Sequence, residues 1–123
     1  MANELTLNAT LAYSKNNITV TESVVNLLAT VTGNGVQALA AYSAPTASTA
    51  LPLGSVAVPG GWVFIMNTDA TNYVKVQTAV AGTEFIRLLP GEFALFRLAP
   101  GLTAPALSAD TAACVVKYAI FDL

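Results

Sequence analysis

Alternation of apolar with polar or small residues at the start of the chain limits what it can fold into. From residue 5 to residue 13, every second side chain is apolar or aromatic, and the residues between them are Thr, Asn or Ala. A period of two places alternate side chains on opposite faces of a strand, whereas a helix needs a period near 3.6. Residues 5–13 are therefore predicted to form a half-buried strand.

Short runs of β-branched and aromatic residues recur along the rest of the chain. They predict further strands over 18–21, 24–31, 36–43, 55–58, 62–67, 73–77, 84–89, 92–98 and 112–121. Residues 24–31 also fit a helix, but their branched side chains and the Gly33-Asn34-Gly35 stop favour a strand. Turn residues separate the strands at 14–17, 59–61, 68–72, 81–83, 90–91 and 100–110. Eight or more short strands at this spacing predict an all-β, antiparallel sandwich or barrel, as one domain over 1–123.

One hairpin can be predicted with its register. A turn centred on Pro90-Gly91 would place Leu88 opposite Phe93 and Ile86 opposite Leu95. The same register pairs Glu84 with Arg97 as a cross-strand ion pair, and Phe85 with Phe96 on the other face.

Composition narrows the classes of function. The chain is 54% hydrophobic and only 10% charged, against about 25% charged residues in an ordinary soluble domain. With a net charge of −2, this indicates surface that a protein partner covers. The five basic residues form no cluster, so we expect no nucleic-acid partner. We also expect no membrane partner, because no apolar run approaches the ~18 residues of a membrane span, and the N-terminus does not resemble a signal peptide.

Residue types needed for catalysis are missing. The chain has no histidine and a single cysteine, Cys114, so nucleophilic triads and zinc sites cannot be assembled. The loop 67–72 carries several side-chain oxygens but lacks the spacing of a calcium loop, and it is interpreted as a polar turn. Glu84 and Glu92 could serve as a glycosidase pair, but they flank a tight turn and are expected on different faces. We therefore predict no enzyme, no catalytic residue, no cofactor and no metal.

Two segments are predicted to make protein contacts. Residues 1–12 are expected to form an extended N-terminal strand or arm, and residues 44–53, rich in Pro and small residues, an extended loop that its own core specifies weakly. Most aromatic side chains are expected in the core, with Trp62 beside the Gly-Gly turn as the exposed one. The candidate interaction residues are Leu5, Leu7, Leu11, Pro45, Leu51 and Trp62.

The second half of the chain resembles small virion proteins of tailed bacteriophages. The shared features are a Pro-Gly turn leading into an apolar strand and an Asn-Asp-Thr-Asn loop (residues 59–74), the Leu-Pro-Gly-Glu turn (88–92), and Ala109 to Ala113 before an apolar terminal strand. The resemblance covers roughly residues 54–123.

This resemblance implies a jelly-roll-like sandwich on the capsid surface of a virion. It implies a capsid decoration (cement) protein that binds the major capsid protein and stabilises the shell, as a homo-oligomer with a trimer favoured. The resemblance implies no catalytic residues in this chain. The alternative is a receptor- or glycan-binding module of a phage head fibre or tail, which would need an exposed aromatic platform around Trp62.

Overall fold

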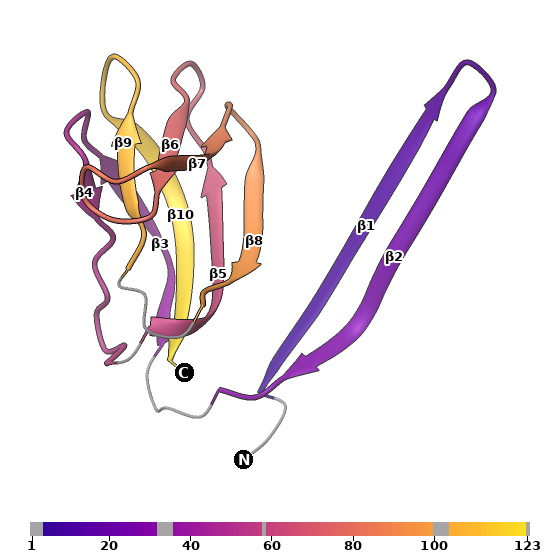
Figure 1. Ribbon diagram of the computed structural model, residues 1–123, viewed down its shortest axis with the longest axis horizontal. Coiled ribbons are helices and arrows are strands. Elements are labelled where there is room, and N and C mark those ends of the chain that lie inside the picture. Colours follow the sequence, from indigo (N-terminus) through magenta and orange to yellow (C-terminus); the bar gives the residue numbers. More distant parts are fainter. Residues whose placement is uncertain (1–3, 32–35, 58, 100–103, 123) are drawn as a thin grey trace. The chain divides into compact units, whose positions relative to one another are not determined.

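The computed structural model describes residues 4–31, 36–57, 59–99 and 104–122, and it divides the chain into two compact units. The first unit comprises residues 1–32 and the second residues 33–123. Every regular element among the described residues is a β-strand (Figure 1). The sequence predicts one domain over 1–123 with an arm over 1–12; the contacts instead confine the sandwich to the second unit.

The first unit is a long antiparallel hairpin of β1 (Leu5–Lys15) and β2 (Ile18–Ala29). Its turn residues Asn16 and Asn17 have φ values of 53° and 64°, as a two-residue type I′ turn requires. Asn tolerates this left-handed region better than most residues, which explains why the chain turns here. The two strands predicted over 18–21 and 24–31 are one strand that ends at Ala29.

A β-bulge interrupts the hairpin. Leu7 pairs with Leu27 and Ala9 with Val24, so two residues of β2 lie against Asn8. The Asn8 side-chain oxygen accepts a hydrogen bond of 2.8 Å from the backbone N–H of Asn26. The extra residue shifts the alternation by one place, which puts Leu27 on the same face as Leu7.

Among its described residues, the second unit is an antiparallel β-sandwich of eight strands, which confirms the predicted all-β sandwich. One sheet has the order β3-β10-β5-β8 and the other the order β4-β9-β6-β7 (Figure 1). The strands are β3 (Val36–Ala44), β4 (Thr49–Ala50), β5 (Pro59–Asn67), β6 (Val74–Gln77), β7 (Glu84–Leu88), β8 (Phe93–Arg97), β9 (Ala106–Ala109) and β10 (Cys114–Asp122).

The core lies between the two sheets and follows the alternation of the strands. Val63 and Ile65 of β5 and Val116 of β10 face it from one sheet, and Val76 of β6 and Leu107 of β9 face it from the other; all five are fully buried. Alternation with one buried face is the pattern of an antiparallel sandwich.

Three predictions of strands or breaks in this unit are wrong. Residues 55–57 form a turn and irregular backbone instead of a strand, and residue 58 lies outside the described residues. The predicted break at 59–61 is instead the start of β5. Strand β9 lies inside the predicted break 100–110, because Ala106-Leu107-Ser108-Ala109 lacks the branched and aromatic residues that mark strands.

The predicted hairpin around Pro90-Gly91 is also wrong. β7 and β8 are consecutive, but β7 pairs with β6 in one sheet and β8 pairs with β5 in the other. The turn therefore crosses between the sheets. Phe85 and Phe96 do meet, edge to face with ring centroids 5.9 Å apart, but as a contact between sheets.

Candidate interaction surfaces

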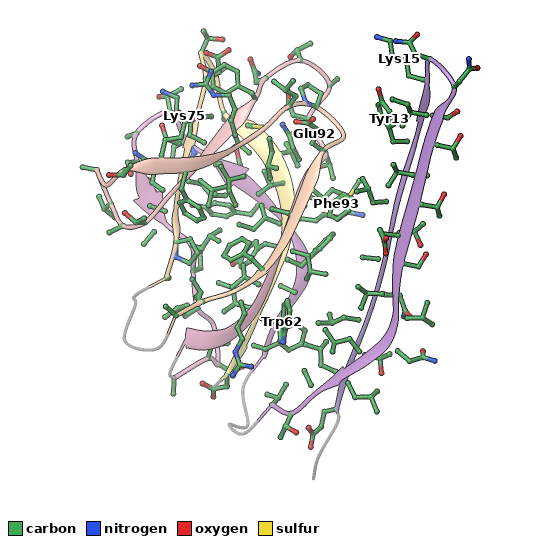
Figure 2. The ribbon with its side chains drawn as sticks, turned by 45° about the vertical axis from the view of Figure 1, so that its right-hand side comes forward. Tyr13, Lys15, Trp62, Lys75, Glu92 and Phe93 are labelled. Atoms are coloured by element: carbon green, nitrogen blue, oxygen red, sulfur yellow. The ribbon has the colours of Figure 1, made fainter. Side chains whose placement is uncertain are left out.

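The hairpin has one apolar and one polar face. Directly opposed residues of an antiparallel pair share a face. On the first face, Leu7 opposes Leu27, Ala9 opposes Val24 and Tyr13 opposes Val20, as part of a set completed by Leu5, Leu11, Lys15, Ile18, Glu22 and Ala29. The opposite face pairs Thr10 with Ser23 and Ser14 with Thr19, and away from the turn it carries Leu28, which opposes Thr6 and is 51% exposed. Tyr13 and Lys15 project from the same side of the hairpin near its turn (Figure 2).

Most apolar side chains of this face are exposed, and Leu5 and Leu7 are half-buried. Leu11 exposes 64% of its surface and Ile18 57%, and Tyr13, Val20, Val24 and Leu27 each expose more than two fifths. A soluble protein rarely leaves a continuous apolar stripe of this kind uncovered unless the stripe is an interaction site. We therefore treat this hairpin face, defined by the residues named above, as the first candidate surface.

A second apolar surface lies on the outer face of the sheet β3-β10-β5-β8. Val63, Ile65 and Asn67 of β5 point into the core, so Trp62, Phe64 and Met66 point outward. On the neighbouring β8 they are opposed by Arg97, Leu95 and Phe93, respectively. Lys117 and Val115 of β10 complete this outer sheet face.

Aromatic side chains dominate the outer sheet face. Phe93 exposes 59% of its surface, and its ring packs against Phe64 with centroids 6.1 Å apart (Figure 2 shows Trp62 and Phe93). Trp62 is half-buried, so Phe93, Tyr13 and Phe85 are more exposed aromatic residues than Trp62. The alternation 62, 64, 66 is visible in the sequence, but it does not reveal which of two apolar faces is the inner one.

The structure brings three of the six predicted contact residues together. Leu5, Leu7 and Leu11 lie on the apolar face of the hairpin, and Trp62 lies on the outer sheet face. Sequence reasoning missed the β2 half of the hairpin face. The alternating Ile18, Val20, Glu22 and Val24 could have indicated it, because they repeat the period of the first strand.

The predicted contact loop 44–53 is anchored in the sandwich, so its description as weakly specified is wrong. Leu51 is 2% exposed and belongs to the core, which removes it as a contact residue. Its N–H donates to the carbonyl of Pro105 at 3.0 Å. Pro45 is half-buried, and its carbonyl accepts a 2.8 Å hydrogen bond from the N–H of Ala109. The two-residue strand β4 pairs with β9 in the same segment.

The polar loop 67–72 is held by its own hydrogen bonds. One Asp69 carboxylate oxygen accepts the N–H groups of Thr71 and Asn72 at 3.0 and 2.8 Å, and these bonds, that from Asn72 foremost, lower the pKa of Asp69. The fully buried Asn67 amide donates to the carbonyls of Asn72 and Leu88 at 2.9 Å each. This arrangement is a capped turn, as interpreted from the sequence.

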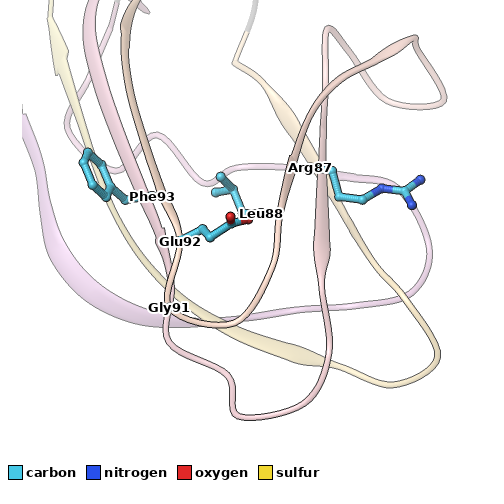
Figure 3. A pocket seen from close by; sticks show the side chains of 5 residues that line it. All are labelled: Arg87, Leu88, Gly91, Glu92 and Phe93. Atoms are coloured by element: carbon cyan, nitrogen blue, oxygen red, sulfur yellow. The ribbon is translucent and has the colours of Figure 1, made fainter. Parts of the chain in front are cut away.

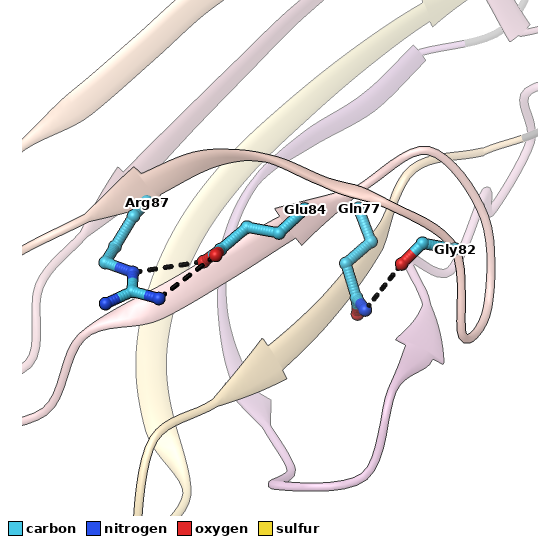
Figure 4. A network of polar contacts seen from close by, with 4 residues as sticks. All are labelled: Gln77, Gly82, Glu84 and Arg87. Carbon is cyan, nitrogen blue, oxygen red and sulfur yellow. Dashed lines mark hydrogen bonds and ion pairs between the residues drawn. The ribbon is translucent and has the colours of Figure 1, made fainter.

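Glu84 and Glu92 are engaged separately. Arg87 donates to both oxygens of Glu84, at 3.0 and 3.1 Å, and this contact lowers the pKa of Glu84 (Figure 4). Glu84 and Arg87 are three positions apart in β7. The bulge between them brings both side chains to the same side of the strand. The predicted partner of Glu84, Arg97, belongs to the other sheet.

Glu92 accepts the N–H of Leu89 at 2.7 Å and so closes the β7–β8 turn. It lines a surface hollow of about 480 Å³ together with Arg87, Leu88, Gly91 and Phe93. The Arg87 side chain points away from Glu92 there (Figure 3). No acid–base pair converges in this hollow.

Cys114 lies fully buried in the sandwich. Burial, and secondarily the nearby charge of Asp69, raises the pKa of its thiol to about 11. Its sulfur lies 3.2 Å from the side-chain oxygen of Asn67. A thiol in this environment is a core side chain and not a nucleophile at neutral pH.

Within the described ranges, no group of three or more acidic or cysteine side chains is placed to hold a metal ion. The same residues include no helix long and apolar enough to cross a membrane. Comparison of the chain with known protein families, with curated proteins and with solved structures found no match.

Proposed function

We propose that this chain is a capsid decoration (cement) protein of a tailed bacteriophage, with a structural and not a catalytic role. The observation that carries the proposal is the hairpin β1–β2, whose apolar face exposes most of its large side chains, with Leu5 and Leu7 half-buried. An isolated two-stranded hairpin is marginally stable in water, so we expect a partner surface to cover the apolar face and stabilise the hairpin. The resemblance of residues 54–123 to virion proteins points to the capsid as that setting.

The strand order of the sandwich supports a jelly roll. Each sheet of β3-β10-β5-β8 and β4-β9-β6-β7 takes its four strands from both halves of the unit. Consecutive strands such as β3 and β4, or β7 and β8, fall in different sheets. An eight-stranded double sheet built this way is the arrangement that jelly-roll capsid domains use.

The proposed action is to bridge neighbouring subunits of the major capsid protein at the surface of the shell. Leu5, Leu7 and Leu11 supply apolar contact area, and the unpaired backbone edges of β1 and β2 can add to a neighbouring strand. Several identical weak contacts on one particle raise the overall affinity without a single strong site, which fits a homotrimer.

Binding to undecorated capsids tests this function. Deletion of residues 2–12 should abolish occupancy while the circular dichroism of the sandwich is retained. The finer variant Leu11→Asp should lower occupancy strongly, whereas Thr10→Asp, which adds the same charge to the polar face, should leave it near the wild-type level. Full occupancy of the deletion variant would refute the proposal.

A second candidate function is binding of a receptor or glycan by a fibre or tail component. The observation in its favour is the aromatic outer sheet face, where Trp62, Phe64 and Phe93 lie together. Aromatic faces stack on sugar rings and use little conformational entropy. Titration with oligosaccharides from host cell envelopes tests it: binding should occur and should disappear in Trp62→Ala, and a wild-type chain that binds none of them excludes this function.

A further inference from the structure

The chain carries two exposed apolar faces, one on each unit, and their chemistry is complementary. We propose that the hairpin face of one copy covers the outer sheet face of a second copy. This inference rests on the proposed function only in using the same hairpin as the docking element: a second copy covers the hairpin in the free chain, and the major capsid protein takes that place on the shell. The contact is head to tail, because the two surfaces that meet are different.

The hairpin supplies a narrow apolar stripe of simple composition. Its central rows are Ala9–Val24, Leu11–Glu22 and Tyr13–Val20, and aliphatic rows lie on the side away from the turn. The outer sheet face offers Trp62, Phe64 and Met66 on β5 beside Leu95 and Phe93 on β8. Aliphatic side chains against aromatic ones are favourable pairs when two sheets pack face to face.

Charge favours this combination over contact between two outer sheet faces. The charged residues placed on the outer sheet face by the described strands are Arg97 and Lys117, both basic. Two such faces would bring like charges together in an apolar contact. The hairpin face presents Glu22 in the middle of its apolar rows, opposite Leu11, and Lys15 at its turn end, opposite Ile18. When its central rows cover the sheet, the hairpin therefore gives Arg97 or Lys117 an acidic partner in Glu22.

Area favours a closed exchange of hairpins. Two strands about 10 Å wide and about 35 Å long present only about 350 Å², against about 800 Å² per partner in a stable complex. In a closed assembly every copy gives one hairpin and receives one, so each copy uses both faces and buries about twice that area. Head-to-tail contacts between copies either continue as an open chain or close. When they close, the copies form a ring or a reciprocal dimer.

Sedimentation equilibrium of the purified full chain, without capsids, tests the proposal. The wild-type chain should sediment as an oligomer. Leu11→Asp on the hairpin face and Phe93→Asp on the outer sheet face should each weaken association at least about tenfold, because a carboxylate would be buried in an apolar contact. Matched controls are Thr10→Asp on the polar hairpin face and Val80→Asp, an exposed loop position, which should stay within about twofold of wild type.

Mixing of the two variants distinguishes the hairpin-on-sheet contact from other modes of association. The Phe93→Asp copy keeps an intact hairpin and the Leu11→Asp copy keeps an intact sheet face. An equimolar mixture keeps one of the two contacts, so it should form a heterodimer that is weaker than the wild-type assembly, at concentrations where each variant alone is monomeric. A mixture that stays monomeric, a Phe93→Asp variant that assembles like wild type, or a wild-type chain that is monomeric would each overturn the proposal.

Folding is checked in the same samples by circular dichroism and by the fluorescence of Trp62. If Phe93→Asp unfolds, Arg97→Glu replaces it, since reversal of an exposed charge spares the packing and should still weaken association severalfold. Capsid binding is a separate measurement. A wild-type chain that binds capsids but does not self-associate refutes this inference alone, and a wild-type chain that self-associates but does not bind capsids refutes only the proposed function.

Discussion

The hairpin and the sandwich follow the same rule of alternation but differ in what covers their apolar faces. In the sandwich, the inward-facing apolar side chains of β5 and β10 are covered by β6 and β9 of the second sheet. In the hairpin, the large apolar side chains of the apolar face from Leu11 to Leu27 are exposed to a large extent. A period of two therefore identifies strands and faces, but it does not show whether the cover comes from the same chain.

This difference predicts two kinds of stability. The sandwich should unfold cooperatively as a unit with its own core. The hairpin should contribute little to that transition until a partner covers it, since a free two-stranded ribbon is marginal in water. Matched substitutions in the two units can sharpen or break this contrast.

The largest contrast is expected for the same truncation in both units. Leu107→Ala, at a fully buried position of β9, should lower the free energy of unfolding by about 2–5 kcal/mol through lost burial and a cavity. Leu11→Ala, at a position 64% exposed, should change it by less than about 0.5 kcal/mol in dilute solution. Urea unfolding followed by Trp62 fluorescence measures both. Equal losses would mean that the hairpin folds as part of the sandwich core.

The next contrast compares two asparagines. Asn67→Ala removes the amide that serves the buried carbonyl of Leu88 and the carbonyl of Asn72, and should cost roughly 2–3 kcal/mol. Asn8→Ala removes one exposed contact to the N–H of Asn26, and should cost under about 1 kcal/mol because water replaces it. The same urea experiment applies to Asn67, and cross-strand nuclear Overhauser contacts report on Asn8. A mild Asn67→Ala variant would contradict the role given to this amide.

These contrasts also show what the sequence alone could predict. Strands β6, β7, β8 and β10 were located to within two residues, because their turn signals and branched residues agree. Their pairing was not predictable: a Pro-Gly turn can close a hairpin or, as between β7 and β8, pass from one sheet to the other. The residues of the turn are similar in both cases, and the packing of the core determines which of the two connections forms.

The candidate surfaces were predicted in part for the same reason. Leu5, Leu7 and Leu11 were found because strict alternation marks a face. Leu51 was misplaced because its Pro-rich neighbours indicate a surface loop, while the burial of its side chain depends on distant strands. The outer sheet face was missed because β5 is apolar on both sides, so its sequence does not distinguish core from surface.

Turn substitutions should have smaller effects, of opposite sign in the two units. Gly91 has a φ of +85°, and a Cβ added there would meet no atom within 4 Å, so Gly91→Ala should cost about 1–2 kcal/mol through backbone strain alone. Asn17→Gly should stabilise the hairpin by a few tenths of a kcal/mol, because Asn-Gly is the preferred pair in a type I′ turn. Thermal unfolding measures the first and the population of the Lys15–Ile18 pair, by nuclear magnetic resonance, the second. A stabilising Gly91→Ala would be inconsistent with the positive φ.

The smallest effect is expected from the charge of Asp69, and it depends on pH. The N–H groups of Asn72 and Thr71 hold the pKa of Asp69 below the ordinary value of 3.8, so the folded state favours the ionised form. The stabilisation is present above pH 3.8 and is lost as the pH falls through the lowered pKa, when the folded state takes up the proton. Asp69→Asn should thus be less stable than wild type at pH 7, with a gap that closes under strong acid. Glu22→Gln on the hairpin is the control and should leave the unfolding midpoint of the sandwich unchanged at both extremes. A gap for Asp69→Asn that persists undiminished at the acid extreme would assign its effect to lost hydrogen-bond geometry and not to charge.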